Sequence, residues 1–499
     1  MRKMFRFHIP LRALIALGIC LGLTSGCALT SSQHVLGDVP SNPSSIYVPH
    51  SPSHTIVVVA PPKPKSIQDR QVAFHEGQVL TLARCIEVAF ARNPETRESW
   101  QRARAAAAGV GQARAAYLPA ADFTAGASRA APVSLDSQQG TGAANTFDAE
   151  LGVRYLLFDG GARSAGLQGA EAELLGANFQ HNMTLQNVAL KVKEAYYQLL
   201  AARELERVAE ETVRQTQYHV ELARARHENG LVVRSDVLKA ETEKANADLL
   251  MVRARSEVRI AQGRLANAMG LRPSTSFEVA KLAHNPEQRE LANIKRLMAD
   301  AAAGRPGLRA ALALVASARA NVEAEKTRYW PKITLNSDYG WRDRSFVPDR
   351  DEWSLGLGIT WPLFDGFDRE YAVRRAESDL AGSRAKYEKL LRGVELEVWT
   401  AYAQLIEADQ AIEAAQALVT SADESAQVTE GEYKNGTATI IDVTDTQTAR
   451  TTANVRLVQS RLDWYTALAR LERAVGSILA SDSDKQLAET DTIEKTPTK

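Results

Sequence analysis

The chain has 499 residues, and its 60 Lys and Arg balance its 60 Asp and Glu, so the formal net charge is zero. A neutral chain shows no electrostatic sign of a nucleic-acid partner. Hydrophobic residues make up 45% of the chain and aromatic residues only 6%. This profile favours long, closely packed helices over the core of a large enzyme.

The first residues predict an exported lipoprotein. Four basic residues accompany the apolar run 13–23, which is too short to span a bilayer and is typical of a signal peptide, here residues 1–26. The run leads into Leu23-Thr-Ser-Gly-Cys27, which resembles a bacterial lipobox. That resemblance implies that Cys27 carries lipid, such as palmitate, and begins the mature chain. Thr24 stands where Leu is commonest, so ordinary cleavage near Gly26 without a lipid is the alternative.

Residues 27–77 are rich in Pro, Ser and other polar residues. They predict a lipidated N-terminal linker that lies along the surface of the folded body. Cys20 would leave with the signal peptide, so Cys85 is the only other mature thiol. An internal disulfide is therefore excluded.

From residue 78 onward the chain repeats itself. Pro94 and Pro119 return 212 residues later, whereas the later landmarks return after 206 residues. These landmarks are Leu157-Phe-Asp-Gly160 with Leu363-Phe-Asp-Gly366, and Asn229-Gly230 with Asn435-Gly436. The pattern predicts two structural repeats, 78–271 and 290–479, followed by a disordered tail at 480–499. The offset between the copies falls from 212 to 206 residues after Pro331. The next element in each copy is a predicted β-hairpin, so its loop should be longer in the first copy.

Each repeat contains a predicted β-hairpin, at 119–158 and at 331–363. One face of the strands is apolar and carries Phe147, Ala149, Leu151, Val153, Tyr155, Ile333, Leu335, Tyr339, Trp341, Trp353, Leu355, Leu357, Ile359 and Trp361. Such alternation is typical of transmembrane barrel strands, and the alternative is a hairpin half-buried on a soluble core. Four strands cannot close a barrel, and an open edge is not viable in lipid, so the barrel must be shared between chains.

A long helix follows each hairpin, over 161–229 and 367–435, with no proline in either range. About 70 residues give roughly 100 Å of helix. Apolar residues recur at alternating spacings of four and three, which predicts a coiled-coil seam. The seam of the second copy is Val394, Val398, Ala401, Leu405, Ala408, Ile412, Ala415 and Val419. An Asn-Gly pair then ends each helix, and a partner helix returns to Gly270 or Gly476.

Two copies of this arrangement on an exported lipoprotein resemble the TolC-type outer-membrane efflux channel family over roughly residues 78–479. The most specific stretch is Tyr433-Lys-Asn-Gly-Thr-Ala-Thr-Ile-Ile-Asp-Val-Thr-Asp445. The resemblance implies a mainly α fold with a small transmembrane β part. It implies a homotrimer in which four strands per chain form a 12-stranded β-barrel, continued by a long periplasmic α-helical coiled-coil barrel. It also implies a periplasmic adaptor and an inner-membrane transporter as partners, in the envelope of a Gram-negative bacterium.

The resemblance assigns a periplasmic gate to the two helical tips, near 229–236 and 433–445. Asp442 and Asp445 would line the closed entrance as acidic rings, and their mutual repulsion would raise their pKa values. Asp236 would help to hold the gate, and Tyr433 would hydrogen-bond between neighbouring hairpins. The residues alone also allow a local role, because Thr439-Ile-Ile-Asp442 has the pattern of a capping box.

The chain departs from the family at Ala438, where some members carry an Arg that locks the gate. Lys434 or Arg234 could supply the missing cation. The resemblance also assigns adaptor docking to the two turns, which comprise Asn229, Gly230, Leu231, Asn435, Gly436 and Thr437. The alternative is that these turn residues only cap helices.

No catalytic motif is present: the sequence has no P-loop, no nucleotide fingerprint and no Cys/His cluster of metal spacing. The chain is therefore predicted to be no enzyme and to need no cofactor. The predicted function is the passive exit duct of a tripartite efflux system. The alternatives are the outer-membrane component of a type I protein secretion system and a non-conducting coiled-coil protein of the envelope. The sequence does not identify the substrate.

Overall fold

The computed structural model describes residues 39–49, 79–130, 143–280, 293–346 and 351–476. The predicted signal peptide, the lipid site at Cys27 and the tail at 480–499 lie outside the described residues. The chain divides into two compact units. The sheet unit contains the described residues of Met1–Ser41, Gln101–Asn178 and Ala310–Glu388. The hairpin unit contains the described residues of Asn42–Trp100, Phe179–Arg309 and Lys389–Lys499.

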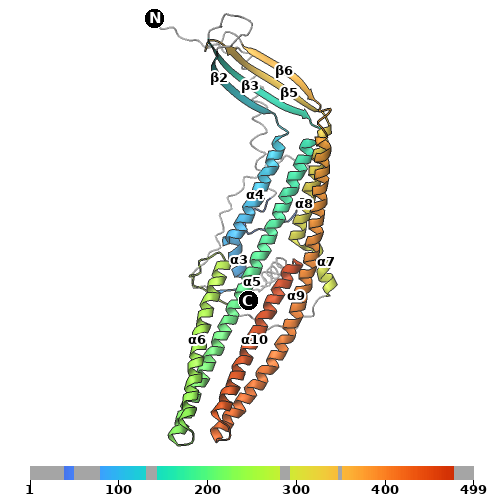
Figure 1. The fold of residues 1–499 in the computed structure, drawn as a ribbon. Helices are drawn as coiled ribbons and strands as arrows, with labels where there is room; N and C mark the ends of the chain where they lie inside the picture. The colour runs from blue at the N-terminus through green and yellow to red at the C-terminus, as the bar shows by residue number, and fades with distance from the viewer. Residues whose placement is uncertain (1–38, 50–78, 131–142, 281–292, 347–350, 477–499) are drawn as a thin grey trace, which may run out of the picture. The chain divides into compact units, whose positions relative to one another are not determined.

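The elements follow the same order twice along the chain (Figure 1). The first copy comprises β1 (Val79–Leu80), α3 (Leu82–Arg92), α4 (Pro94–Ala115), β2 (Ala120–Ala130), β3 (Ala144–Phe158), α5 (Ala162–Glu228) and α6 (Arg234–Ala268). After β4 (Glu278–Val279), the second comprises α7 (Ile294–Gly304), α8 (Pro306–Lys326), the 3₁₀ turn η1 (Thr327–Tyr329), β5 (Lys332–Asp343), β6 (Glu352–Thr360), α9 (Asp368–Asn435) and α10 (Ile440–Val475). The mainly α fold with four longer strands and an internal repeat is as predicted.

Local signals explain where the short helices begin. The Thr81 hydroxyl accepts a hydrogen bond from the Arg84 N–H and caps α3. Asn93 ends α3, and its side chain accepts from the Glu95 N–H at the start of α4, where Pro94 needs no backbone partner. In the part of the chain that the structure describes, no helix combines the length and the apolarity needed to cross a membrane.

The sheet unit holds an antiparallel sheet in the order β2-β3-β5-β6. Its register aligns Phe123, Leu151, Tyr339 and Trp353 in one row across all four strands. This face is apolar, and in the single chain Phe123 is 71% and Trp353 75% exposed, whereas Leu151 on β3 is half-buried. The other face is polar, and the Ser354 hydroxyl donates to Asp338 across β5 and β6. The predicted alternation is thus present in the register.

Among the described residues, β2 and β6 each pair along one edge only. The connection from β2 to β3 comprises residues 131–143, and that from β5 to β6 comprises 344–351. The first is the longer, in agreement with the change of offset between the copies.

Equivalent Asp–Arg pairs lie between strand and long helix in both copies. Arg163 pairs with Asp159 at 3.0 Å and donates to the Leu156 carbonyl. Arg369 pairs with Asp365 at 2.6 Å and donates to the Pro362 carbonyl. Each Asp follows the repeated Leu-Phe, and each Arg stands four residues later. Both members of the ion pair are therefore part of the sequence repeat.

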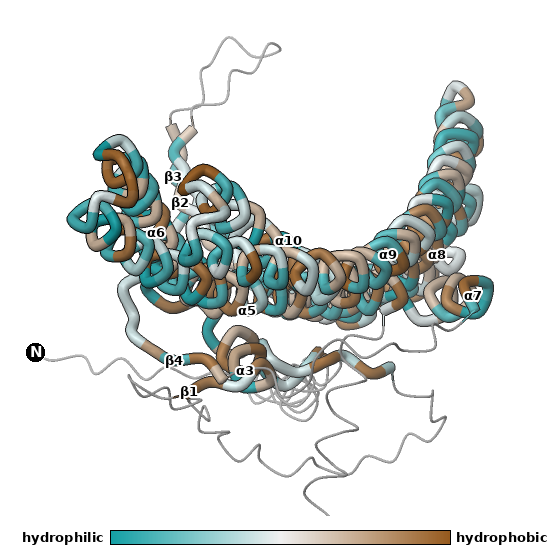
Figure 2. Tube along the Cα trace, turned by 90° about the horizontal axis from the view of Figure 1, so that it is seen from below, coloured by the Kyte–Doolittle hydropathy of each residue, from teal (hydrophilic) through white to brown (hydrophobic). Residues whose placement is uncertain are grey.

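In the hairpin unit, α3 packs against α5 and α6 around fully buried Leu199, Leu265 and Met269. Cys85 belongs to this core as a free thiol, and burial raises its pKa to about 12. The long helices bury the predicted seam: Val398 and Leu405 are almost completely buried. Figure 2 shows hydrophobic residues recurring along α9 and α10 among hydrophilic ones.

Part of the predicted linker lies against α5. The backbone of Tyr47 exchanges two hydrogen bonds with the Asn182 side chain, at 2.7 and 2.8 Å. The ring of Tyr47 meets Phe179 edge-on, at 5.6 Å between centroids.

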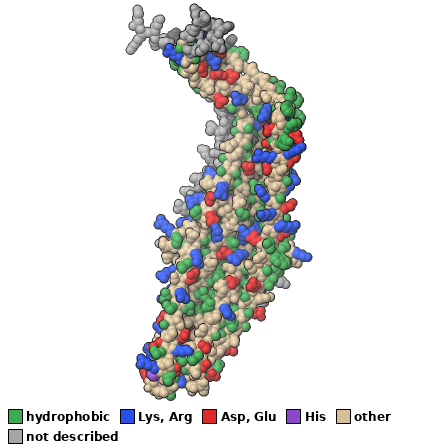
Figure 3. Space-filling model, in the orientation of Figure 1, with side chains coloured by type: hydrophobic (Ala, Val, Ile, Leu, Met, Phe, Trp, Pro, Cys, Tyr) green, Lys and Arg blue, Asp and Glu red, His purple; other side chains and the backbone are tan. Residues whose placement is uncertain are grey.

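On the face drawn in Figure 3, basic and acidic side chains alternate along the helices without a large patch of one sign, as expected for a neutral chain.

Candidate gate at the helical tips

Two helical hairpins end in turns that need glycine. The first hairpin is α5–α6 and the second is α9–α10. Gly230 and Gly436 have φ of 72° and 85°, in the left-handed region. The Leu231 N–H donates to the Arg226 carbonyl, and the Thr437 N–H donates to the Glu432 carbonyl, which closes each helix end.

The six residues predicted to dock an adaptor are Asn229, Gly230, Leu231, Asn435, Gly436 and Thr437, and all six are exposed in these turns. They close the ends of α5 and α9 and at the same time leave surface for a partner. The turn residues therefore do cap helices, as the alternative predicted. Adaptor docking stays a prediction.

A hydrophobic cluster, here called the tip cluster, joins the two hairpins of one chain just behind the turns. It consists of Val220, Ala223, Val237, Ala240, Tyr433, Ile440 and Val443. Tyr433 on α9 is only 1% exposed, and its neighbours come from α5, α6 and α10. Removing this ring from water therefore holds the tips together through hydrophobic burial.

The Tyr433 hydroxyl is buried and has no hydrogen-bond partner among the described residues. The predicted hydrogen bond from Tyr433 to a neighbouring hairpin is thus not formed within the chain. Burial raises the pKa of this phenol, and the charge of half-buried Asp236 adds to the shift while Arg226 opposes it. Asp236 stands in the first turn of α6, where a carboxylate suits the helix dipole.

Asp442 forms the predicted capping box at the start of α10. Its carboxylate accepts from the Thr439 N–H at 2.8 Å and from the Thr439 hydroxyl at 2.7 Å. These bonds lower the pKa of Asp442, which is opposite to the predicted increase. The reason is that a single chain contains the cap but no ring of carboxylates. A lowered pKa means that the cap is complete above the ordinary carboxyl pKa and is lost as pH falls through the lower value.

Asp445 is exposed one turn further along α10, three residues from Asp442. Both carboxylates are open to solvent in the single chain, so neither is committed to a buried ion pair. The acidic ring predicted for Asp442 and Asp445 involves more than one chain and stays a prediction.

The basic side chain that contacts Tyr433 is Arg226, which was not among the residues predicted from the sequence. Its guanidinium carbon lies 4.7 Å from the centroid of the Tyr433 ring, and Nη1 donates to the Tyr433 carbonyl. Of the two predicted substitutes, Arg234 is exposed, whereas Lys434 bonds Glu430 on its own helix and lies 5.3 Å from the Tyr218 ring of α5. A basic residue in the last turn of α5 was the available signal.

Further from the turns, a groove of about 220 Å³ opens between α5, α6 and α10. Its lining is rich in threonine, and Thr212 bonds Thr451 across the two hairpins at 3.2 Å. His219 lies buried in the lining with its Nδ1 unpaired among the described residues, and burial lowers its pKa.

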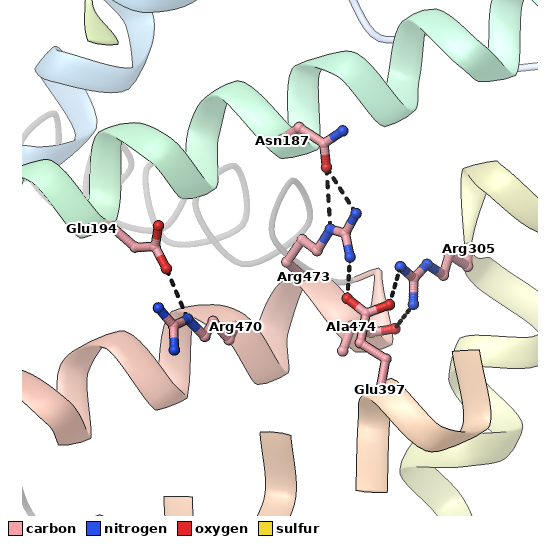
Figure 4. Close-up of polar contacts among 7 residues, drawn as sticks. All are labelled: Asn187, Glu194, Arg305, Glu397, Arg470, Arg473 and Ala474. Carbon is pink, nitrogen blue, oxygen red and sulfur yellow. Dashed lines mark hydrogen bonds and ion pairs between the residues drawn. The ribbon is translucent and has the colours of Figure 1, made fainter. Parts of the chain in front are cut away.

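At its far end, α10 is held by an ion-pair network (Figure 4). Glu397 on α9 accepts from Arg305 at 2.5 Å and from Arg473 on α10. Arg473 also donates to Asn187 of α5, at 3.0 and 3.2 Å. Burial lowers the pKa of Arg305, whose side chain is only 10% exposed, and the nearby Glu397 carboxylate opposes that shift.

Replacing Glu397 by Ala should leave two close guanidinium groups without their shared carboxylate. Glu397 is 37% exposed, so solvent screening reduces the cost to about 1–3 kcal/mol of unfolding free energy. Glu395→Ala removes only the exposed pair with Arg392 and should cost less than about 0.5 kcal/mol. Denaturant unfolding followed by helical circular dichroism measures both variants, and equal midpoints would contradict the role of the network.

Two long helical hairpins with a clustered tip, joined to a sheet with one apolar face and open edges, define an export-channel protomer. The family model described as outer membrane efflux protein matches residues 85–271 and 297–477. The chain belongs to this family. It is an outer-membrane efflux channel protein and, as a transport duct, not an enzyme.

Individual proteins are similar to this chain in sequence or in fold. Protein CyaE of Bordetella pertussis is 29% identical over 334 residues, covering 65% of this chain and 69% of the relative. Outer membrane efflux protein BepC of Brucella suis is 24% identical over 412 residues, covering 82% and 88%. The crystal structure of the outer membrane protein VceC from Vibrio cholerae has a TM-score of 0.69 at 20% identity, covering 79% and 96%. That likeness shows a shared fold.

Proposed function

We propose that three copies of this chain form the passive exit duct of a tripartite efflux system. The observation that carries the proposal is the apolar face of the sheet, with its exposed side chains such as Trp353, together with the two edges that lack a partner strand among the described residues. Three such sheets, joined edge to edge, would close a 12-stranded barrel with the apolar face toward lipid and the polar face toward the lumen. The coiled-coil hairpins would continue the duct into the periplasm.

In this proposal the gate consists of Asp236, Tyr433, Asp442 and Asp445 at the tips. Carboxylates at the narrowest point of a pore favour cations. A periplasmic adaptor would dock on the two exposed turns, and an inner-membrane transporter would supply the energy. A lipid on Cys27 would anchor the linker to the outer membrane.

Single-channel recording tests the proposal directly. The purified full-length protein, reconstituted in a planar lipid bilayer, should give small, cation-preferring currents. The absence of current from protein that is folded and inserted would overturn the channel function and favour a non-conducting envelope protein. Cross-linking of the same preparation should give a trimer, and a stable monomer or dimer would contradict the shared barrel.

A further inference from the structure

Arg226 makes the most specific contact between the two hairpin tips. It stands in the last turn of α5, and its guanidinium reaches across to the second hairpin. There it covers the ring of Tyr433 and donates to the Tyr433 carbonyl. Its Nη2 also lies 3.4 Å from the position that a Cβ would take at Gly436, so the turn of the second hairpin passes close to it.

Three attractions meet at this guanidinium. The Tyr433 carbonyl, in the last turn of α9, also accepts from the Gly436 N–H at 3.1 Å, so the guanidinium adds a second, charge-assisted donor to this oxygen. Helices α5 and α9 both end beside the guanidinium, so the negative ends of two helix dipoles face one cation. The face of the Tyr433 ring adds a cation–π attraction, which the burial of the ring strengthens.

The family resemblance placed a locking cation at the position of Ala438, which here only packs at the edge of the tip cluster. Resting on the proposed function, we propose that Arg226 is the positioning residue that holds the two tips of each chain together in the closed gate. The cation thus comes from the end of α5, on the opposite hairpin. Opening the gate separates the Arg226 guanidinium from the ring and the carbonyl of Tyr433.

The test compares Arg226→Ala with Arg224→Ala in the purified full-length protein. Arg224 stands two residues earlier on the same helix, but it pairs with Glu241 of α6 and so acts within the first hairpin. In Arg226→Ala, amide hydrogen exchange at 229–236 and 433–445 should be roughly tenfold faster, because a charge-assisted bond and a cation–π contact are lost. Arg224→Ala should exchange like the wild type at the second tip.

Conductance supplies the functional measurement. Arg226→Ala should conduct severalfold more than the wild type, whereas Arg224→Ala should not. Arg226→Lys keeps the charge but lacks the planar guanidinium, so it should restore part of the closure. This conservative variant also replaces Arg226→Ala if the alanine variant does not fold.

The outcomes separate the two proposals. Equal exchange and equal conductance in Arg226→Ala and Arg224→Ala would overturn the role of Arg226 and leave the channel intact. Faster exchange confined to Arg226→Ala, with no current from any variant, would support the contact and overturn the channel function. Faster exchange together with a larger current in Arg226→Ala alone supports both.

Discussion

Neutralising both tip carboxylates, as Asp442→Asn/Asp445→Asn, should abolish the cation preference of the channel and increase its conductance. In the proposed trimer these positions would place up to six carboxylates at one constriction, so their removal would eliminate the charge that attracts cations there. The measurement is the reversal potential in a planar bilayer under a salt gradient. The matched control is Asp463→Asn, which neutralises an exposed carboxylate further along the same helix. A double variant with the selectivity of the wild type would contradict the acidic gate.

The capping box makes the choice of substitution important. Asn at position 442 can still accept from the Thr439 N–H, whereas Ala cannot. Asp442→Ala should therefore change selectivity as Asp442→Asn does and, in addition, speed amide exchange in the first turn of α10. If the two variants exchange equally fast in the first turn of α10, the cap does not stabilise this helix end.

Gly270→Ala should cost about 2–4 kcal/mol of unfolding free energy. Gly270 ends the first copy with φ at 73°, and a Cβ there would lie 2.7 Å from the Arg92 carbonyl oxygen and 2.8 Å from the Asn93 Cα. Neither backbone atom can move aside, because Asn93 ends α3, begins α4 and donates to the Ala268 carbonyl. The free-energy cost of the left-handed backbone conformation and the cost of the steric overlap therefore add.

The second copy supplies the control, since Gly476 is its equivalent. Its φ is 90°, but the nearest backbone atom, the Arg305 Cα, would lie 3.5 Å from an added Cβ. Gly476→Ala should therefore cost only the conformational term, about 1 kcal/mol. Loss of helical circular dichroism in denaturant measures both variants. Equal midpoints would show that the overlap at Gly270 is relieved by movement of the α3–α4 junction.

Much of this protein was predictable from short-range patterns. A spacing of four and three placed Val398 and Leu405 in the seam, and alternation placed Trp353 on the apolar face of the sheet. The pattern from Thr439 to Asp442 predicted a cap that the structure contains. These features involve residues only a few positions apart, so helix and strand geometry alone brings their side chains together.

The sequence by itself thus determined the repeat, the helices, the turns and the two faces of the strands. Only the tertiary structure decided that Arg226 meets Tyr433 and that Glu397 is shared by Arg305 and Arg473. Arg226 and Tyr433 are 207 positions apart. Whether they meet depends on the rotation and axial offset of two separate hairpins. Periodicity defines which face of a helix is buried, but it does not define which residue of a neighbouring helix lies opposite.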